Sequence, residues 1–227
     1  MKQYIIESAS RAQNNAREFQ LFNRILVTVT DSLPQNINLK AVLKNVETKI
    51  PKHLLSDVDS IYIGNYQALN DRQVDSLYIN GSILITNNQP SDKELFSTIV
   101  HEFAHAIEEI AKDFIYGDGK LANEFIAKRK TLFNLLKDDY KLNAKAFLDI
   151  NFNKNFDEFA YKTIGYDNLG VVTSGLFMSP YACTSLREYF ANGFEHYFLH
   201  DDREVRELSP SLYRKIREIL QPDLFNA

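Results

Sequence analysis

Residues 97–109, STIVHEFAHAIEE, contain two histidines four positions apart, with a glutamate directly after the first. On a helix, residues at this spacing lie on the same side, so the imidazoles of His101 and His105 can bind one metal ion together. Neutral imidazole is a usual ligand of Zn²⁺. Glu102 would lie beside the metal without binding it, where its carboxylate can take a proton from a water on the metal. The pattern predicts a zinc site. The alternative is an ordinary amphipathic helix with two incidental histidines.

The segment around this motif has the signals of a helix that follows a short strand. Ser91 can be the N-cap, and Glu94 stands three residues later, as in a capping box. Apolar residues then recur at helical spacing: Leu95, Ile99, Phe103, Ala106 and Ile110. Upstream, Asn80-Gly81 separates two apolar runs and predicts a β-hairpin turn. The motif is therefore expected on a helix that follows a strand, which is the context that a zinc-peptidase motif needs.

A catalytic zinc site needs a third protein ligand and keeps one position open for water. The metzincin spacing would place a histidine where this chain has Ala111, so that class is excluded. The helix predicted over residues 185–199 offers Glu188 and Glu195, which helical phase does not separate because they are seven residues apart. With Ser185 as N-cap, Glu188 has a competing role in a second capping box. The spacing alone leaves this choice open.

Two short motifs together resemble those of one group of peptidases. His101-Glu102-x-x-His105 and the later PYACTSLREYFA, in which Tyr181 stands seven residues before Glu188, resemble the anthrax lethal factor catalytic domain. They are also similar to Mlc titration factor A and the clostridial Pro-Pro endopeptidases. The similarity is thin outside these motifs.

The resemblance implies a zinc endopeptidase of the gluzincin type with one Zn²⁺ per chain. It implies that His101, His105 and Glu188 bind the metal and that Glu102 activates the water. It also implies that the hydroxyl of Tyr181 donates a hydrogen bond to the oxyanion formed at the scissile carbonyl, where a neutral donor stabilises charge that exists only in the transition state.

The chain departs from this group one turn after Glu188. The relatives usually carry an acid where this chain has Asn192. Such an acid holds the far nitrogen of a ligand histidine, and the amide oxygen of Asn192 can accept that hydrogen bond without supplying negative charge. We therefore expect Asn192 next to the ligands and a weaker site, not a lost one. Glu108 or Glu109 is an alternative source of charge.

The pattern of elements predicts an α+β, zincin-like fold. We expect residues 1–55 to be a mostly helical lead-in and residues 56–227 to be the metallopeptidase domain. That domain would have a small, mostly antiparallel sheet with an edge strand packed on the motif helix, and then a mainly helical C-terminal half. SILIT, residues 82–86, is the candidate edge strand for an extended substrate, unless it is a core strand. GLFMSP, residues 175–180, is the candidate opposite wall.

Composition limits the partners. The chain has 227 residues, 44% of them hydrophobic, and a formal net charge of −4, which argues against a nucleic-acid binder with a general basic surface. The basic run Lys128-Arg129-Lys130 lies in a helical pattern among acids and is expected on a solvated face. The single cysteine excludes an intrachain disulfide. No apolar segment resembles a signal peptide or a membrane span, so we expect a cytoplasmic protein or a delivered or leaderless effector.

These observations predict a zinc-dependent endopeptidase that hydrolyses a protein or peptide bound in extended form. The alternative is a non-catalytic regulatory or binding protein that retains the fold around a structural metal, which Asn192 and the capping role of Glu188 would explain. The sequence does not indicate the side chains of the substrate or the oligomeric state.

Overall fold

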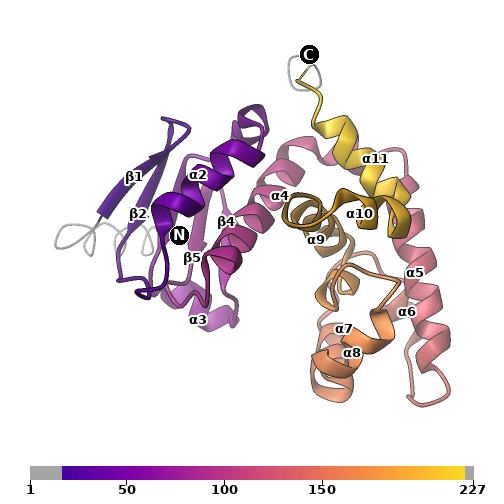
Figure 1. The fold of residues 1–227 in the computed structure, drawn as a ribbon. Helices are drawn as coiled ribbons and strands as arrows, with labels where there is room; N and C mark the ends of the chain where they lie inside the picture. The colour runs from indigo at the N-terminus through magenta and orange to yellow at the C-terminus, as the bar shows by residue number, and fades with distance from the viewer. Residues whose placement is uncertain (1–16, 223–227) are drawn as a thin grey trace. The chain divides into compact units, whose positions relative to one another are not determined.

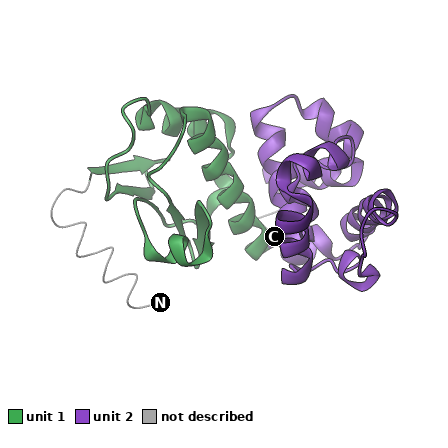
Figure 2. Cartoon of the chain, turned by 90° about the horizontal axis from the view of Figure 1, so that it is seen from below, with its two compact units in different colours: residues 1–110 green, residues 111–227 purple. Residues whose placement is uncertain are grey.

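The computed structural model describes residues 17–222 of the chain. Its fold is α+β, as predicted, with a five-stranded sheet followed by a helical C-terminal half. Two compact units divide between Ile110 and Ala111 (Figure 2). The division falls inside the long helix α4 (Asp92–Tyr116), where the backbone of Ala111, with φ of −107° and ψ of 16°, interrupts the helical geometry.

The sheet of the first unit is mixed (Figure 1). Its strands, in the order in which they lie side by side, are β1 (Arg17–Leu21), β2 (Ile25–Val29), β3 (Ser60–Ile63), β5 (Ser82–Ile85) and β4 (Ser76–Ile79). The three inner strands run parallel, and each outer strand runs antiparallel to its neighbour. The expectation of a mostly antiparallel sheet is therefore wrong. The reason is the crossover through α2 (Leu39–Lys49), which returns the chain so that β3 runs parallel to β2.

The predicted hairpin turn is confirmed, and of the two interpretations of residues 82–86 the core strand is the correct one. Asn80 and Gly81 have φ of 47° and 81°, and a two-residue turn of this kind needs positive values at both positions. The strand over residues 82–86 is not an edge, because β5 pairs with β3 on one side and with β4 on the other. After α3 (Gln67–Arg72) the chain forms β4 on the outside, and the hairpin then inserts β5 between β4 and β3.

One face of the sheet forms the core of the first unit. Along β3 and β5, alternate side chains on this face are fully buried: Ile61, Ile63, Ile83 and Ile85. The register places Ser76 of β4 opposite Ile85, on this same face. Because the hydroxyl of Ser76 donates to the carboxylate of Glu102 on α4, that helix packs on the core face.

The segment before β3 contributes two strands to the same sheet. Residues 17–55 contain β1, β2, α2 and the short helix η1 (Lys52–Leu55), and β2 pairs directly with β3. A boundary at residue 55 therefore does not coincide with the division between the two units. The first 16 residues of the expected lead-in lie outside the described residues.

The local signals around the motif are confirmed. The hydroxyl of Ser91 accepts a hydrogen bond from the backbone N–H of Glu94 at 3.1 Å, so Ser91 caps α4. The helix continues to Tyr116 and the next helix begins at Lys120, after Gly119 with φ of 70°. In the part of the chain that the structure describes, no helix is long and apolar enough to cross a membrane.

The second unit is helical, as predicted for the C-terminal half. Its elements are α5 (Lys120–Leu136), α6 (Ala144–Phe147), α7 (Lys154–Glu158), the π-helix η2 (Phe159–Ile164), α8 (Tyr166–Thr173), the 3-10 helix η3 (Tyr181–Cys183), α9 (Leu186–Leu199), α10 (Asp202–Leu208) and α11 (Pro210–Ile219).

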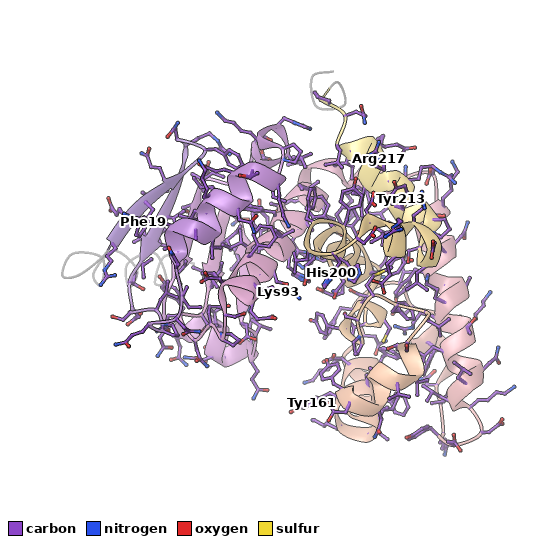
Figure 3. The ribbon with its side chains drawn as sticks, viewed as in Figure 1. Phe19, Lys93, Tyr161, His200, Tyr213 and Arg217 are labelled. Atoms are coloured by element: carbon purple, nitrogen blue, oxygen red, sulfur yellow. The ribbon has the colours of Figure 1, made fainter. Side chains whose placement is uncertain are left out.

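Helices α9 and α11 pack closely. A Cβ atom on Gly193 would lie 2.1 Å from Cδ2 of Leu212, so a larger residue here would force the Leu212 side chain to move. Further along, Tyr213 and Arg217 project from α11 (Figure 3). The ring of Tyr213 lies 6.0 Å from that of Tyr197 on α9, and Nη1 of Arg217 lies 3.5 Å from the Tyr197 hydroxyl. These contacts fix the helix that carries Glu188.

Candidate metal centre

The first unit presents the two motif histidines together on α4. The ring centroids of His101 and His105 are 4.9 Å apart, and the ring planes are inclined by 84°. His105 is buried and His101 is half-buried. The four-residue spacing has thus placed both imidazoles on the same side of the helix, as the sequence predicted.

A carboxylate lies next to the second histidine. Oε2 of Glu108 is 3.6 Å from Nδ1 of His105, and both side chains are buried. A carboxylate near one ring nitrogen favours a proton on that nitrogen and leaves the other as the acceptor that a metal requires. Of the two alternative sources of negative charge, Glu108 has this position, whereas Glu109 is exposed.

Glu102 is a buried carboxylate on α4. It is only 3% exposed, and its Oε1 accepts a hydrogen bond of 2.6 Å from the hydroxyl of Ser76. Its Oε2 is also buried but has no hydrogen-bond partner among the described residues. A buried carboxylate oxygen without a partner is unfavourable, because burial removes the water that would solvate it. The buried Oε2 of Glu102 therefore fits a site that binds a group from outside the protein chain.

In the second unit, Glu188 stands in the first turn of α9 and is half-buried. The hydroxyl of Ser185 accepts a hydrogen bond from the backbone N–H of Glu188 at 3.1 Å, which confirms Ser185 as the N-cap. This bond uses the backbone of Glu188 and not its carboxylate. The two histidines belong to the first unit and Glu188 to the second. That the carboxylate of Glu188 joins the histidines as a metal ligand is a proposal.

Asn192 has a role that the sequence did not indicate. Its Nδ2 donates to the carbonyl of Glu188 at 2.9 Å, and its Oδ1 accepts from the hydroxyl of Ser179 at 2.5 Å. The same Ser179 oxygen accepts from the backbone N–H of Ala182 at 3.2 Å. Asn192 thereby fastens α9 to the turn that carries Tyr181. Its contact with a ligand histidine stays a prediction.

Tyr181 is the first residue of η3, directly after Pro180, and is 37% exposed. Its carbonyl accepts from the backbone N–H of Thr184 at 3.0 Å and from the Thr184 hydroxyl at 2.8 Å. The guanidinium of Arg129 donates to the carbonyl of Cys183 within the same turn. The backbone of this segment is therefore held in place by hydrogen bonds.

The basic run on α5 is not a solvated face, and that expectation is wrong for two of its three residues. Arg129 is fully buried and donates to the carbonyls of Ala146 and Phe147 at 2.8 and 2.9 Å, and Lys128 is 9% exposed. Both residues share the apolar stripe of α5 with Leu121, Phe125, Leu132 and Leu136. That stripe is the sequence signal that placed them inside, and only Lys130 points to solvent.

The segment GLFMSP borders a cavity of about 460 Å³ within the second unit. Its walls also come from α8 and from α10, which contributes Glu204 and Glu207. The role of this segment as a wall for the substrate stays a prediction.

Comparison with known proteins identifies no relative. No family model matches the chain, and neither a curated protein nor a solved structure matches it.

Proposed function

We propose that this chain is a zinc-dependent endopeptidase of the gluzincin type. His101, His105 and Glu188 together offer two imidazole nitrogens and one carboxylate oxygen, a set that could hold a metal ion. Calcium and magnesium prefer oxygen ligands, whereas two imidazoles and a carboxylate are a known set for catalytic zinc. Three protein ligands also leave the fourth position for water.

The surroundings of Glu102 carry the proposal. The carboxylate lies on the same helix as the histidine pair, with one oxygen held by Ser76 and the other buried with no partner among the described residues. A structural metal site has no need of such an oxygen, but a base that receives a proton does. The resemblance to the lethal factor catalytic domain assigns the same role to this residue.

The residues of the chain then have these roles. When bound, the metal acts as a Lewis acid that polarises the scissile carbonyl and lowers the pKa of a water. Glu102 takes one proton from the attacking water through Oε2 and gives it to the leaving amine, as the new C–O bond forms and the C–N bond breaks. The hydroxyl of Tyr181 donates a hydrogen bond to the oxyanion formed on the carbonyl oxygen.

The substrate strand would add to β4, not to β5. β4 is the last strand of the described sheet, and its outer edge is available for an extended peptide. Its first residue, Ser76, contacts Glu102 directly. Addition of a peptide along this edge would therefore bring its backbone next to the proposed base.

The test measures bound metal and peptide cleavage in the wild type and in Glu102→Gln. Glu94→Gln is the matched control, because Glu94 is an exposed glutamate on the same helix. We expect one zinc per chain in all three proteins and cleavage only in the wild type and the control. A wild-type chain that binds no zinc when zinc is supplied contradicts the proposal.

The second candidate is a non-catalytic protein with a structural metal. The observation in its favour is Asn192, whose amide is already bonded to Glu188 and Ser179 within its own unit and brings no charge to the ligands. A metal coordinated by four protein ligands would support this function. Peptide cleavage that disappears in Glu102→Gln would contradict it.

A further inference from the structure

We propose that Ser76 is a positioning residue for the base Glu102 and joins the edge strand β4 to the catalytic helix. This inference rests on the proposed function, in which Glu102 is the base. No motif indicates it, because Ser76 lies 26 residues before Glu102 in the sequence.

The first observation is the place of Ser76 in the sheet. It lies on the core face of β4 and pairs with Ile85, in a position where an apolar side chain would be ordinary. Ser76 is half-buried, and a hydroxyl that is partly removed from water is stabilised by a hydrogen-bond partner. Its partner is Glu102, on the helix that packs over this face.

The second observation is that the two carboxylate oxygens of Glu102 differ in their hydrogen bonds. Oε1 accepts the hydrogen bond from the Ser76 hydroxyl at 2.6 Å. Oε2 has no partner among the described residues. A carboxylate held at one oxygen cannot rotate freely, so the hydrogen bond determines which oxygen stays open and where it points.

The third observation is that Ser76 begins β4, the edge along which an extended peptide would add. One hydrogen bond thus connects the strand that would receive the substrate with the base that would act on it. Loss of this bond should disorder the base while leaving the backbone edge intact. The expected result is a lower kcat with little change in KM.

Four variants test the effect of the Ser76 hydroxyl separately from the effect of side-chain size. Ser76→Ala removes the hydroxyl, and Ser76→Thr and Ser76→Val form a matched pair of similar shape in which only threonine keeps it. Ser82→Ala is the control, because the Ser82 hydroxyl contacts that of Ser60 at 3.0 Å on the other face of the same sheet. Zinc content, kcat and KM are measured for each protein on one peptide that the wild type cleaves.

We expect Ser76→Ala and Ser76→Val to lower kcat about tenfold, the effect of one lost hydrogen bond, with unchanged zinc content. Ser76→Thr should recover most of the activity, and Ser82→Ala should match the wild type. In zinc-free protein, Ser76→Ala should lower Tm by about 3 °C, and by less in a Glu102→Ala background.

The outcomes are distinct. A wild type that binds zinc and cleaves peptide, together with a Ser76→Val variant of wild-type kcat, overturns the role of Ser76 and leaves the proposed function standing. Equal Tm losses from Ser76→Ala in the two backgrounds also overturn it, because the two side chains would then be uncoupled. A wild type without zinc or cleavage overturns the proposed function and this role with it.

Discussion

Lys128 should make the free energy of unfolding depend on pH, and this dependence can be measured without metal or substrate. Its Nζ donates to the carbonyls of Leu176 and Leu208 at 2.5 and 2.7 Å, so it links α5 to the segment before Tyr181. Burial lowers the pKa of Lys128 from 10.5 to about 8, and the charge of Glu124 opposes this effect only in part. The folded protein therefore holds this proton less tightly than the unfolded chain does.

The sign of the pH dependence follows directly. Below a pH of about 8 both states carry the proton, and the full cost of the buried charge destabilises the fold. Between about 8 and 10.5 the unfolded chain retains the proton while the folded chain has lost it, so the free energy of unfolding rises with pH. The difference between these pKa values corresponds to about 3 kcal/mol, at about 1.4 kcal/mol for each factor of ten.

The assay is urea unfolding of zinc-free protein from about pH 7 to about pH 10. Lys128→Met removes the titrating group at similar length, and Lys130→Met on the exposed side of α5 is the control. Over this range the wild type should gain about 2 to 2.5 kcal/mol relative to Lys128→Met, while its difference from Lys130→Met stays constant. A constant difference between the wild type and Lys128→Met would refute the reasoning.

Three further predictions concern ligand choice and packing. Glu188→Gln should abolish tight zinc binding whereas Glu195→Gln should retain it, as measured by titration with a zinc-competing chelator; the reverse result would transfer the ligand role to Glu195. Gly193→Ala should destabilise the protein by about 1–3 kcal/mol in urea unfolding, because the new Cβ overlaps Leu212, and an unchanged midpoint would show that the helices separate at no cost. Gly81→Ala should cost about 1 kcal/mol, because alanine tolerates the φ of 81° poorly, and a stabilised variant would contradict the turn geometry.

The motif helix could be predicted from the sequence because its signals are local. The N-cap Ser91 and the apolar repeat after it lie within one segment, and the spacing of His101 and His105 fixes their common side without reference to the rest of the chain. The hairpin turn at Asn80-Gly81 is local in the same way.

The order of the strands could not be predicted, because it depends on pairings between distant segments. Nothing in the sequence of β4 or β5 says which one pairs with β3, and the two strands have similar apolar patterns. The burial of Arg129 could not be predicted for a related reason. Its carbonyl partners come from residues 146, 147 and 183, so a charge run that looks solvated in sequence is satisfied only by the folded backbone.

The contact that bears most on function is also nonlocal. Ser76 and Glu102 meet only because β4 takes the outer position of the sheet and α4 packs across its core face. A fully buried carboxylate oxygen without a partner costs about 1–3 kcal/mol of stability. A metal site that only stabilised the fold would not need this buried, unpartnered oxygen. Glutamine or an apolar residue at position 102 would then be more favourable. In the proposed function, Oε2 of Glu102 is the atom that receives a proton, and this is our reason for proposing an enzyme and not a binding protein.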